Sequence, residues 1–136
     1  MKVVIANDQK AFVEHYMVRG DVFIVEQAID WTEELDTWDY EATLFNLYDG
    51  SKAIGAARLY KNKVGRVAVL KEHRHKKAGS ILMRALEDYA KKQGIKTLEL
   101  GAQTYIIPFY ESLGYEAYGD IFLDADIEHR MMRKTL

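Results

Sequence analysis

The sequence contains no cysteine and a single proline among its 136 residues. Without cysteine there can be no disulfide, no thiolate nucleophile and no zinc site built on sulfur. The sequence also lacks an apolar run of the about 18 residues that cross a bilayer, and residues 1–7 lack the layout of a signal peptide. These absences favour a cytoplasmic protein that does not enter a membrane.

Neither sign of charge dominates, since 19 Lys and Arg stand against 21 Asp and Glu, for a net charge of −2. A protein that neutralises many phosphates carries a basic excess, so nucleic acid is not an expected partner. The charges are nevertheless segregated. Residues 26–41 hold seven carboxylates and no Lys or Arg, whereas residues 61–77 hold seven Lys or Arg and one Glu. The two tracts predict a site whose two sides differ in charge.

Hydrophobic patterning predicts one α/β domain over residues 1–136. Helical spacing marks residues 10–25, the segment from Gly79 to Gly94, and a short helix at 105–113 with Pro108 in its first turn. Strand-like patterns mark seven segments, at residues 2–6, 43–48, 53–60, 65–70, 96–100, 115–118 and 121–132. Asp49-Gly50 suits a hairpin turn, and a second hairpin is expected near Asn62. Hairpins followed by a strand-helix-strand unit favour a mixed sheet flanked by helices.

A basic turn joins the predicted strand at residues 65–70 to the helix that follows. Positive charge in this turn comes from Lys71, Arg74, Lys76 and Lys77. Gly79 would let a ligand approach the N–H groups at the start of the helix. The turn is therefore a predicted anion cradle that suits a diphosphate.

Segments 65–94 and 103–115 together resemble the GNAT superfamily of N-acetyltransferases, and the similarity covers nearly the whole chain. The run from Val18 to Gln27, then Ala102-Gln103, Pro108-Phe109-Tyr110, and Glu128-His129 before Met131, is similar to the small bacterial ElaA-like branch. The resemblance implies a single domain with a mixed, mostly antiparallel sheet of about six to seven strands, a central splay and about four flanking helices.

The resemblance implies acetyl-CoA as co-substrate, with its pyrophosphate on the basic turn. The family's Arg-x-x-Gly-x-Gly pattern matches the run Arg74, His75, Lys76, Lys77, Ala78 and Gly79, which Ser80 follows. Lys77 stands where the family has its first glycine. We expect its side chain to point away from the ligand or to lend it charge, and its backbone to avoid positive φ.

The resemblance also places the pantetheine arm along a bulged strand at Val67, Ala68 and Val69. A main-chain N–H there, that of Val69, would stabilise the oxyanion that forms when an amine attacks the thioester. Gln103 would bond the pantetheine arm or orient the acceptor, and Phe109 is a further implied cofactor contact. Plain core packing of the two valines is compatible with this role.

Tyr110 matches the tyrosine that faces the cofactor sulfur in many family members. A phenol stays protonated at neutral pH and can act as the general acid on the departing thiolate. The acceptor amine must lose a proton, and the acidic tract offers Glu26, Glu33, Glu34, Asp36 and Asp39 as bases. We name Glu26 and Asp36, with a chain of waters as the alternative.

The ElaA-like pattern places Arg19, Glu26 and Gln27 near the acceptor, as pocket residues or as members of a structural network. Arg19 and Glu26 are seven residues apart and would share a helix face if the helix persists. His129 would line the same pocket or serve as a hydrogen-bonded structural histidine.

The sequence therefore predicts an enzyme that passes acetyl directly from acetyl-CoA to a primary amine within a ternary complex. The alternative is a non-catalytic CoA-binding or regulatory module of the same fold. A phosphoryl-transfer enzyme is disfavoured, because the chain lacks Gly-x-x-x-x-Gly-Lys-Ser/Thr. No metal is implied. The acceptor is a small-molecule or peptide amine, and a homodimer is left open.

Overall fold

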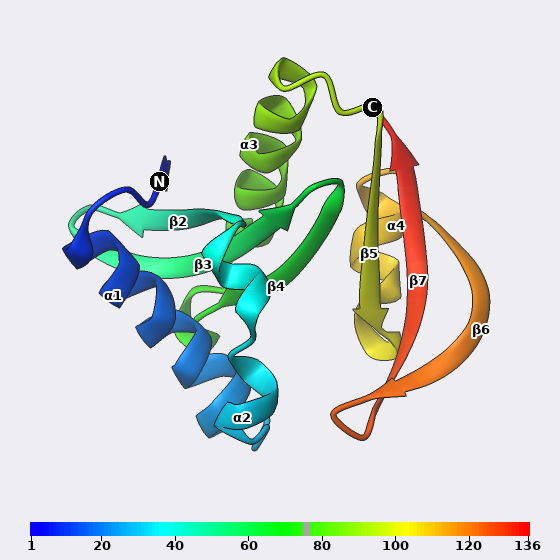
Figure 1. The fold of residues 1–136 in the computed structure, drawn as a ribbon, viewed down its shortest axis with the longest axis horizontal. Helices are drawn as coiled ribbons and strands as arrows, with labels where there is room; N and C mark the ends of the chain where they lie inside the picture. The colour runs from blue at the N-terminus through cyan, green and yellow to red at the C-terminus, as the bar shows by residue number, and fades with distance from the viewer. Residues whose placement is uncertain (75–76) are drawn as a thin grey trace.

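The structure, a computed structural model, describes residues 1–74 and 77–136 and contains one seven-stranded sheet with the order β1-β2-β3-β4-β5-β7-β6 (Figure 1). Its strands are β1 (Lys2–Ile5), β2 (Thr43–Asp49), β3 (Lys52–Tyr60), β4 (Lys63–Val69), β5 (Thr97–Gln103), β6 (Glu116–Asp124) and β7 (Ile127–Thr135). Every neighbouring pair is antiparallel except β4 and β5. The predicted mixed, mostly antiparallel sheet is confirmed.

The α-helices are α1 (Gln9–Arg19), α2 (Trp31–Glu34), α3 (Ala78–Lys92) and α4 (Ile107–Ser112). A π-helix, η1 (Gly20–Glu26), continues α1, and short 3-10 turns occur at η2 (Thr37–Tyr40), η3 (Lys71–His73) and η4 (Thr104–Ile106). Local chemistry explains several boundaries. The Asp8 carboxylate accepts from the Ala11 amide at the start of α1, Gly94 turns left-handed after α3, and Pro108 lies in the first turn of α4 as predicted.

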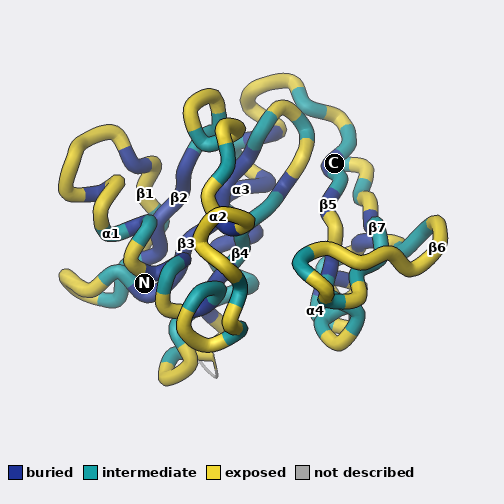
Figure 2. The backbone as a smooth tube through the Cα atoms, turned by 60° about the horizontal axis from the view of Figure 1, so that its bottom comes forward, coloured by how far each residue is buried: buried dark blue, intermediate teal, exposed yellow. Residues whose placement is uncertain are grey.

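Helices cover both faces of the sheet, and the side chains of β3 point alternately to one face and to the other. Ala57 and Leu59 belong to the main core with the buried face of α3, whereas Ala56 packs with Val18 and Val22 from α1 and η1. This alternation is the period-two pattern of a strand buried on both sides. Figure 2 shows burial concentrated in β2, β3 and α3, while β6 at the sheet edge is largely exposed. Within the described residues, no helix is long and apolar enough to cross a bilayer.

The last hairpin differs from the prediction. We expected strands at residues 115–118 and 121–132, but β6 runs through to Asp124 and the chain reverses at Ala125 and Asp126. Both turn residues have positive φ, +51° and +60°, as a primed hairpin turn requires. The sequence carries no glycine or asparagine at this turn, so its usual signal was missing.

Candidate active site

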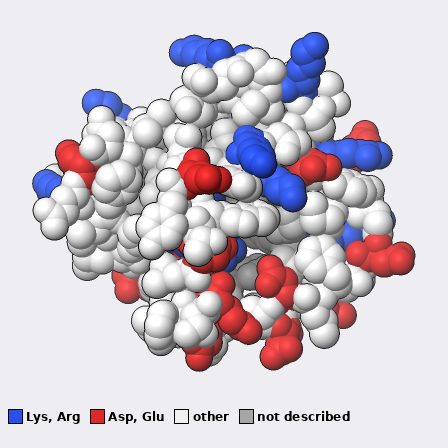
Figure 3. Space-filling model, viewed as in Figure 1, with Lys and Arg blue, Asp and Glu red and all other residues white. Residues whose placement is uncertain are grey.

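A groove opens where β4 and β5 separate. The two strands pair only at Lys63 with Glu99 and at Val64 with Leu100, and then diverge. A cavity of about 570 Å³ fills the gap between them, walled by β4, β5, α4, the β6–β7 hairpin and the segment from η1 to η2. Figure 3 shows a hollow in the middle of this face, with acidic side chains gathered along its lower side. The predicted central splay is confirmed, and it creates the largest break in the sheet's hydrogen bonding.

A bulge in β4 shapes one wall of the groove. Ala56 pairs with Ala68 and Arg58 pairs with Gly65, so β4 has one residue more than β3 over this stretch. Beyond the bulge, the Leu70 amide donates to the Ile54 carbonyl on β3 at 2.8 Å. Because successive amides of a strand point to opposite edges, the amide of Val69 points toward the edge from which β5 has departed. Val67, Ala68 and Val69 all line the groove.

The start of α3 lies at the same groove. The first helical hydrogen bond in this turn runs from the Ile81 amide to the Lys77 carbonyl, which leaves the amides of Ala78, Gly79 and Ser80 without helical acceptors. A Cβ on Gly79 would lie 3.0 Å from Cζ of Phe109, so glycine lets α3 and the Phe109 ring approach closely, and a side chain here would push that ring back. Both residues line the groove. His75 and Lys76, named for the same cradle, lie outside the described residues.

The expectation for the backbone of Lys77 was wrong. Lys77 has φ +58° and ψ +21°, the left-handed conformation that the family's glycine would adopt without strain. The backbone of Lys77 therefore carries the strain of a left-handed residue with a side chain.

Replacing Lys77 by glycine should therefore stabilise the protein. Relief of the left-handed conformation gains about 1–2 kcal/mol, against about 0.5–1 kcal/mol for the added freedom of glycine in the unfolded chain. We expect the free energy of unfolding in urea to rise by about 0.5–1 kcal/mol. Lys77→Ala is the control, because alanine keeps the strain and should bring no such gain. A less stable glycine variant would contradict the prediction.

Arg74 is anchored by η1 and by β4. Its Nη1 and Nη2 each donate to the Glu26 carboxylate at 2.6 Å, and its Nε donates to the Val69 carbonyl at 2.9 Å. Hydrogen bonds from Arg74 hold the pKa of Glu26 below its ordinary value. Glu26 is thus an ionised partner that orients the arginine of the predicted cradle.

Tyr110 lies on α4 at the groove, with 7% of its surface exposed. Its ring packs edge-on against Phe109 and Tyr115, with centroids 5.0 and 5.8 Å away. Burial, together with nearby Tyr105, raises the pKa of the Tyr110 phenol above its ordinary value. The phenol therefore stays protonated at neutral pH and can donate a hydrogen bond into the groove.

Three of the seven carboxylates of the acidic tract are held by arginines in a largely buried cluster that we call the Arg19 network. Its members are Arg19, Glu34, Asp36, Asp39, Arg58 and Arg66. Although burial pushes the pKa of Asp36 upward, hydrogen bonds and charge from Arg58 hold it below its ordinary value. Glu33 differs, since it lines the groove and its carboxylate takes part in none of these ion pairs. The sequence analysis did not name Arg58 or Arg66 as members of the site. The one indication for each was a positively charged residue within an otherwise apolar strand.

Arg19 and Glu26 do not share a helix face. The change from α1 to the π-helix after Arg19 reduces the rotation per residue, so seven residues no longer complete two turns. Arg19 is fully buried and does not line the groove, whereas Glu26 is exposed at the surface. The geometry of Arg19 is that of the structural network which the sequence left as one of two alternatives.

Two amide side chains meet from opposite parts of the chain. Gln103 Nε2, at the end of β5, donates to Gln27 Oε1 at 2.8 Å, and both residues line the groove. His129 on β7 also lines it, stacked on Phe122 with ring centroids 5.7 Å apart. Its Nδ1 lies 2.7 Å from the Ile127 carbonyl oxygen. The structure therefore gathers Gln27, Gln103 and His129 at one cavity.

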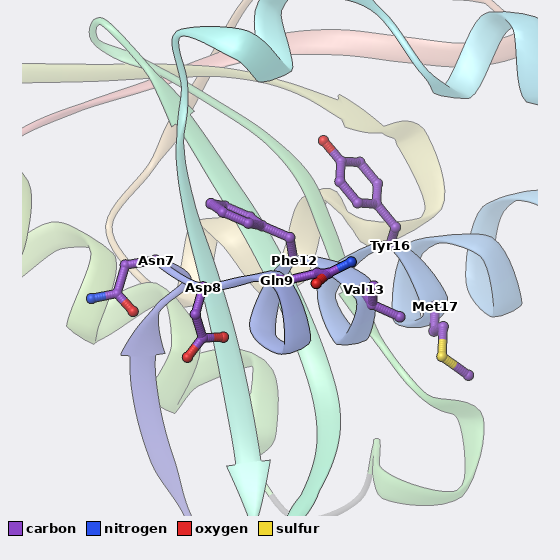
Figure 4. A pocket seen from close by; sticks show the side chains of 7 residues that line it. All are labelled: Asn7, Asp8, Gln9, Phe12, Val13, Tyr16 and Met17. Atoms are coloured by element: carbon purple, nitrogen blue, oxygen red, sulfur yellow. The ribbon is translucent and has the colours of Figure 1, made fainter.

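A second, shallow hollow lies along α1, lined by Asn7, Asp8, Gln9, Phe12, Val13, Tyr16 and Met17 (Figure 4). None of these lining residues is a cation, and the Asp8 carboxylate is already used to cap α1. The hollow therefore offers no anion cradle. Across residues 1–74 and 77–136, no group of three His, Asp or Glu side chains is placed to hold a metal ion.

Comparison with known proteins agrees with this geometry. The family model described as an acetyltransferase (GNAT) domain matches residues 5–136. The chain is 39% identical to the uncharacterized N-acetyltransferase YjcF of Bacillus subtilis, over 98% of this chain and 99% of that protein. Its fold matches the crystal structure of Escherichia coli ElaA with a TM-score of 0.84 at 22% identity, covering 98% of this chain and 99% of ElaA. An aminoglycoside 6'-N-acetyltransferase complexed with coenzyme A matches with a TM-score of 0.73 at 17% identity, over 99% and 97% of the two chains.

Proposed function

Because this chain belongs to the GNAT acetyltransferase family and is an acetyl-CoA-dependent acyltransferase, we propose that it transfers acetyl directly to a primary amine within a ternary complex. The observation that carries this proposal is the splay of β4 from β5, which turns the Val69 amide into an open groove. An N–H so placed can donate to the thioester carbonyl and stabilise the charge that develops there. The absence of cysteine is consistent with transfer that needs no enzyme thioester.

The pyrophosphate of the co-substrate would be held at the start of α3. The amides of Ala78, Gly79 and Ser80 have no acceptor within the helix and would provide donors, and the helix dipole adds positive potential. Arg74 and Lys77 bring charge to the same turn, and His75 and Lys76 complete the proposed cradle. The pantetheine arm would run along Val67 to Val69, with Phe109 and Gln103 as neighbouring contacts.

Tyr110 is the proposed general acid. Its protonated phenol would hydrogen-bond the sulfur as the carbon–sulfur bond breaks, and the proton would pass to the thiolate late in that step. The rigid ring packing around Tyr110 supports this role, because it holds the phenol in one place.

The acceptor amine must be deprotonated before it attacks. Glu26 and Asp36 were the carboxylates first named for this task, but their arginine partners lower the pKa of each, which weakens them as bases. Glu33 lines the groove outside these ion pairs. We propose that the proton leaves through water toward Glu33, a carboxylate of the acidic tract that lines the groove outside the Arg19 network. Gln27 and His129 would orient a small-molecule or peptide amine. The cytoplasmic location and a homodimer stay predictions.

The proposal is tested by acetyl-CoA titration followed by thiol release over an amine panel. We expect calorimetric binding of acetyl-CoA, and release of free CoA that depends on an added polyamine, amino sugar, small amine or lysine peptide. Glu33→Gln should lower the rate of thiol release at neutral pH more than Glu26→Gln. Arg74 binds the carboxylate of Glu26, whereas no ion pair among the described residues involves the carboxylate of Glu33. Binding without acceptor-dependent release would favour the non-catalytic module. No heat at millimolar acetyl-CoA would contradict both readings.

A further inference from the structure

Arg66 occupies an unusual backbone position at the bulge of β4. Its φ is +50°, in the left-handed region that L residues with a side chain rarely adopt. Bulges of this kind normally place glycine at the left-handed position. Here Gly65 lies one residue earlier and pairs regularly with Arg58. Contacts of the Arg66 side chain must therefore compensate for the strain of its backbone.

The guanidinium of Arg66 is clamped by the segment from α2 to η2. Its Nε donates to the carbonyl oxygen of Glu34 at 3.0 Å and to Glu34 Oε2 at 2.9 Å. Its Nη2 donates to Asp36 Oδ2 at 3.2 Å and to the Glu33 carbonyl at 3.3 Å. The side chain thus ties the bulge to a segment about 30 residues earlier in the sequence.

The partners of Arg66 are themselves immobilised. The Glu34 carboxylate is 2% exposed and receives both Nε and Nη2 of Arg19, at 2.8 and 2.7 Å. Asp36 receives two donors from Arg58, at 2.7 and 2.9 Å. Because charged groups buried in mutual contact have few alternative positions, the Arg19 network forms a rigid anchor for the bulge.

We propose that Arg66 is a positioning residue, whose clamped guanidinium keeps its own backbone left-handed in the β4 bulge and so directs the amide of Val69 toward the thioester. This inference rests on the proposed function, in which the Val69 amide stabilises the oxyanion. It also assigns a function to two carboxylates of the acidic tract. Glu34 and Asp36 would hold the backbone of the β4 bulge in place through Arg66, and neither would accept a proton.

Substitution by alanine and by glycine separates this role from a simple charge effect. Both variants remove the guanidinium, but only glycine adopts positive φ without strain. We expect Arg66→Ala to lower kcat about tenfold or more, with the KM for acetyl-CoA within about threefold of wild type, because a small misplacement of a donor mainly affects the transition state. Arg66→Gly should retain an intermediate kcat. Added guanidinium ion should restore part of the kcat of Arg66→Ala.

Lys61 provides the matched control. It is also a non-glycine residue at positive φ, +55°, but lies in the β3–β4 turn and outside the groove. Lys61→Ala and Lys61→Gly should leave kcat unchanged, although glycine should give the more stable variant of the two.

Equal kcat values for Arg66→Ala and Arg66→Gly, or a wild-type kcat in Arg66→Ala, would overturn the proposal. Should the wild-type protein release no thiol with any amine of the panel, the proposed function fails separately, and amide hydrogen exchange of residues 67–69 decides the positioning role. Faster exchange in Arg66→Ala than in Arg66→Gly supports the clamp, and equal exchange in the two variants overturns it.

Discussion

Replacing Tyr110 by phenylalanine should reduce turnover by about 100-fold while leaving acetyl-CoA affinity nearly unchanged. The change deletes only the phenolic oxygen, so the ring contacts with Phe109 and Tyr115 persist. Loss of the acid leaves the thiolate without a proton donor in the step that breaks the carbon–sulfur bond. Steady-state thiol release gives kcat, and calorimetry gives the affinity for acetyl-CoA.

Tyr115→Phe is the matched control for this experiment. Tyr115 belongs to the same ring cluster but does not line the groove, and its hydroxyl donates to Glu87 Oε2 at 2.8 Å. Its phenylalanine variant should lose about 1–3 kcal/mol of stability, since a buried acceptor loses its donor, with little change in kcat. A Tyr110→Phe enzyme with wild-type turnover would remove Tyr110 from the mechanism.

Replacing Arg19 by methionine should destabilise the fold by about 3–5 kcal/mol, the largest stability effect we expect from a single substitution. The side chain is fully buried and is the main partner of Glu34 and Asp39, which are 2% and 7% exposed. Methionine fills a similar volume but removes the fully buried cation shared by Glu34 and Asp39, which leaves Arg66 for Glu34 and Arg58 for Asp39 as their remaining described partners. His15 accepts a hydrogen bond from Arg19 in this cluster, and burial together with the charge of Arg19 lowers the pKa of His15 to about 4.

Urea unfolding measures this effect, and Arg74→Met serves as its control. Arg74 also pairs with a carboxylate through two donors, but its side chain is 37% exposed. An exposed ion pair contributes only about 0–1 kcal/mol, so the control should unfold near the wild-type midpoint. Similar losses from both substitutions would show that burial of the Arg19 network has little energetic weight.

The sequence identified the elements wherever a local signal existed. The apolar face of α3 and Pro108 at the start of α4 formed as predicted, and the hairpin expected at Asp49-Gly50 formed with its turn one residue later, at Gly50-Ser51. The prediction failed at Ala125-Asp126, where a turn formed without its usual residues, and at Lys77, where a lysine accepted the glycine conformation. Ala125-Asp126 joins two strands that pair along β6 and β7, and Lys77 directly precedes α3, so in both places a residue took a conformation that its type does not favour.

The candidate site likewise contains features that could be predicted from the sequence and features that could not. The cradle, the Val67–Val69 strand and Tyr110 were predicted from motif order, and Arg74, Gly79, residues 67–69 and Tyr110 line one groove in the structure. The role of the carboxylates could not be foreseen, because Asp36 meets Arg58 across 22 residues and Glu34 meets Arg66 across 32. No periodicity in the acidic tract or in the strands that carry the arginines indicates which carboxylate will pair with which arginine.

By itself, the sequence determined the fold class and the alternation of elements, and it predicted the position of an anion cradle, because each depends on spacing within one or two turns of chain. Only the tertiary structure decided the bulge register, the left-handed Arg66 and the pairing of acids with arginines. Those features depend on contacts between segments that lie far apart in the sequence. Where such segments meet in the interior, an unpaired charge would cost too much free energy, so the buried acids of the Arg19 network lie beside arginines.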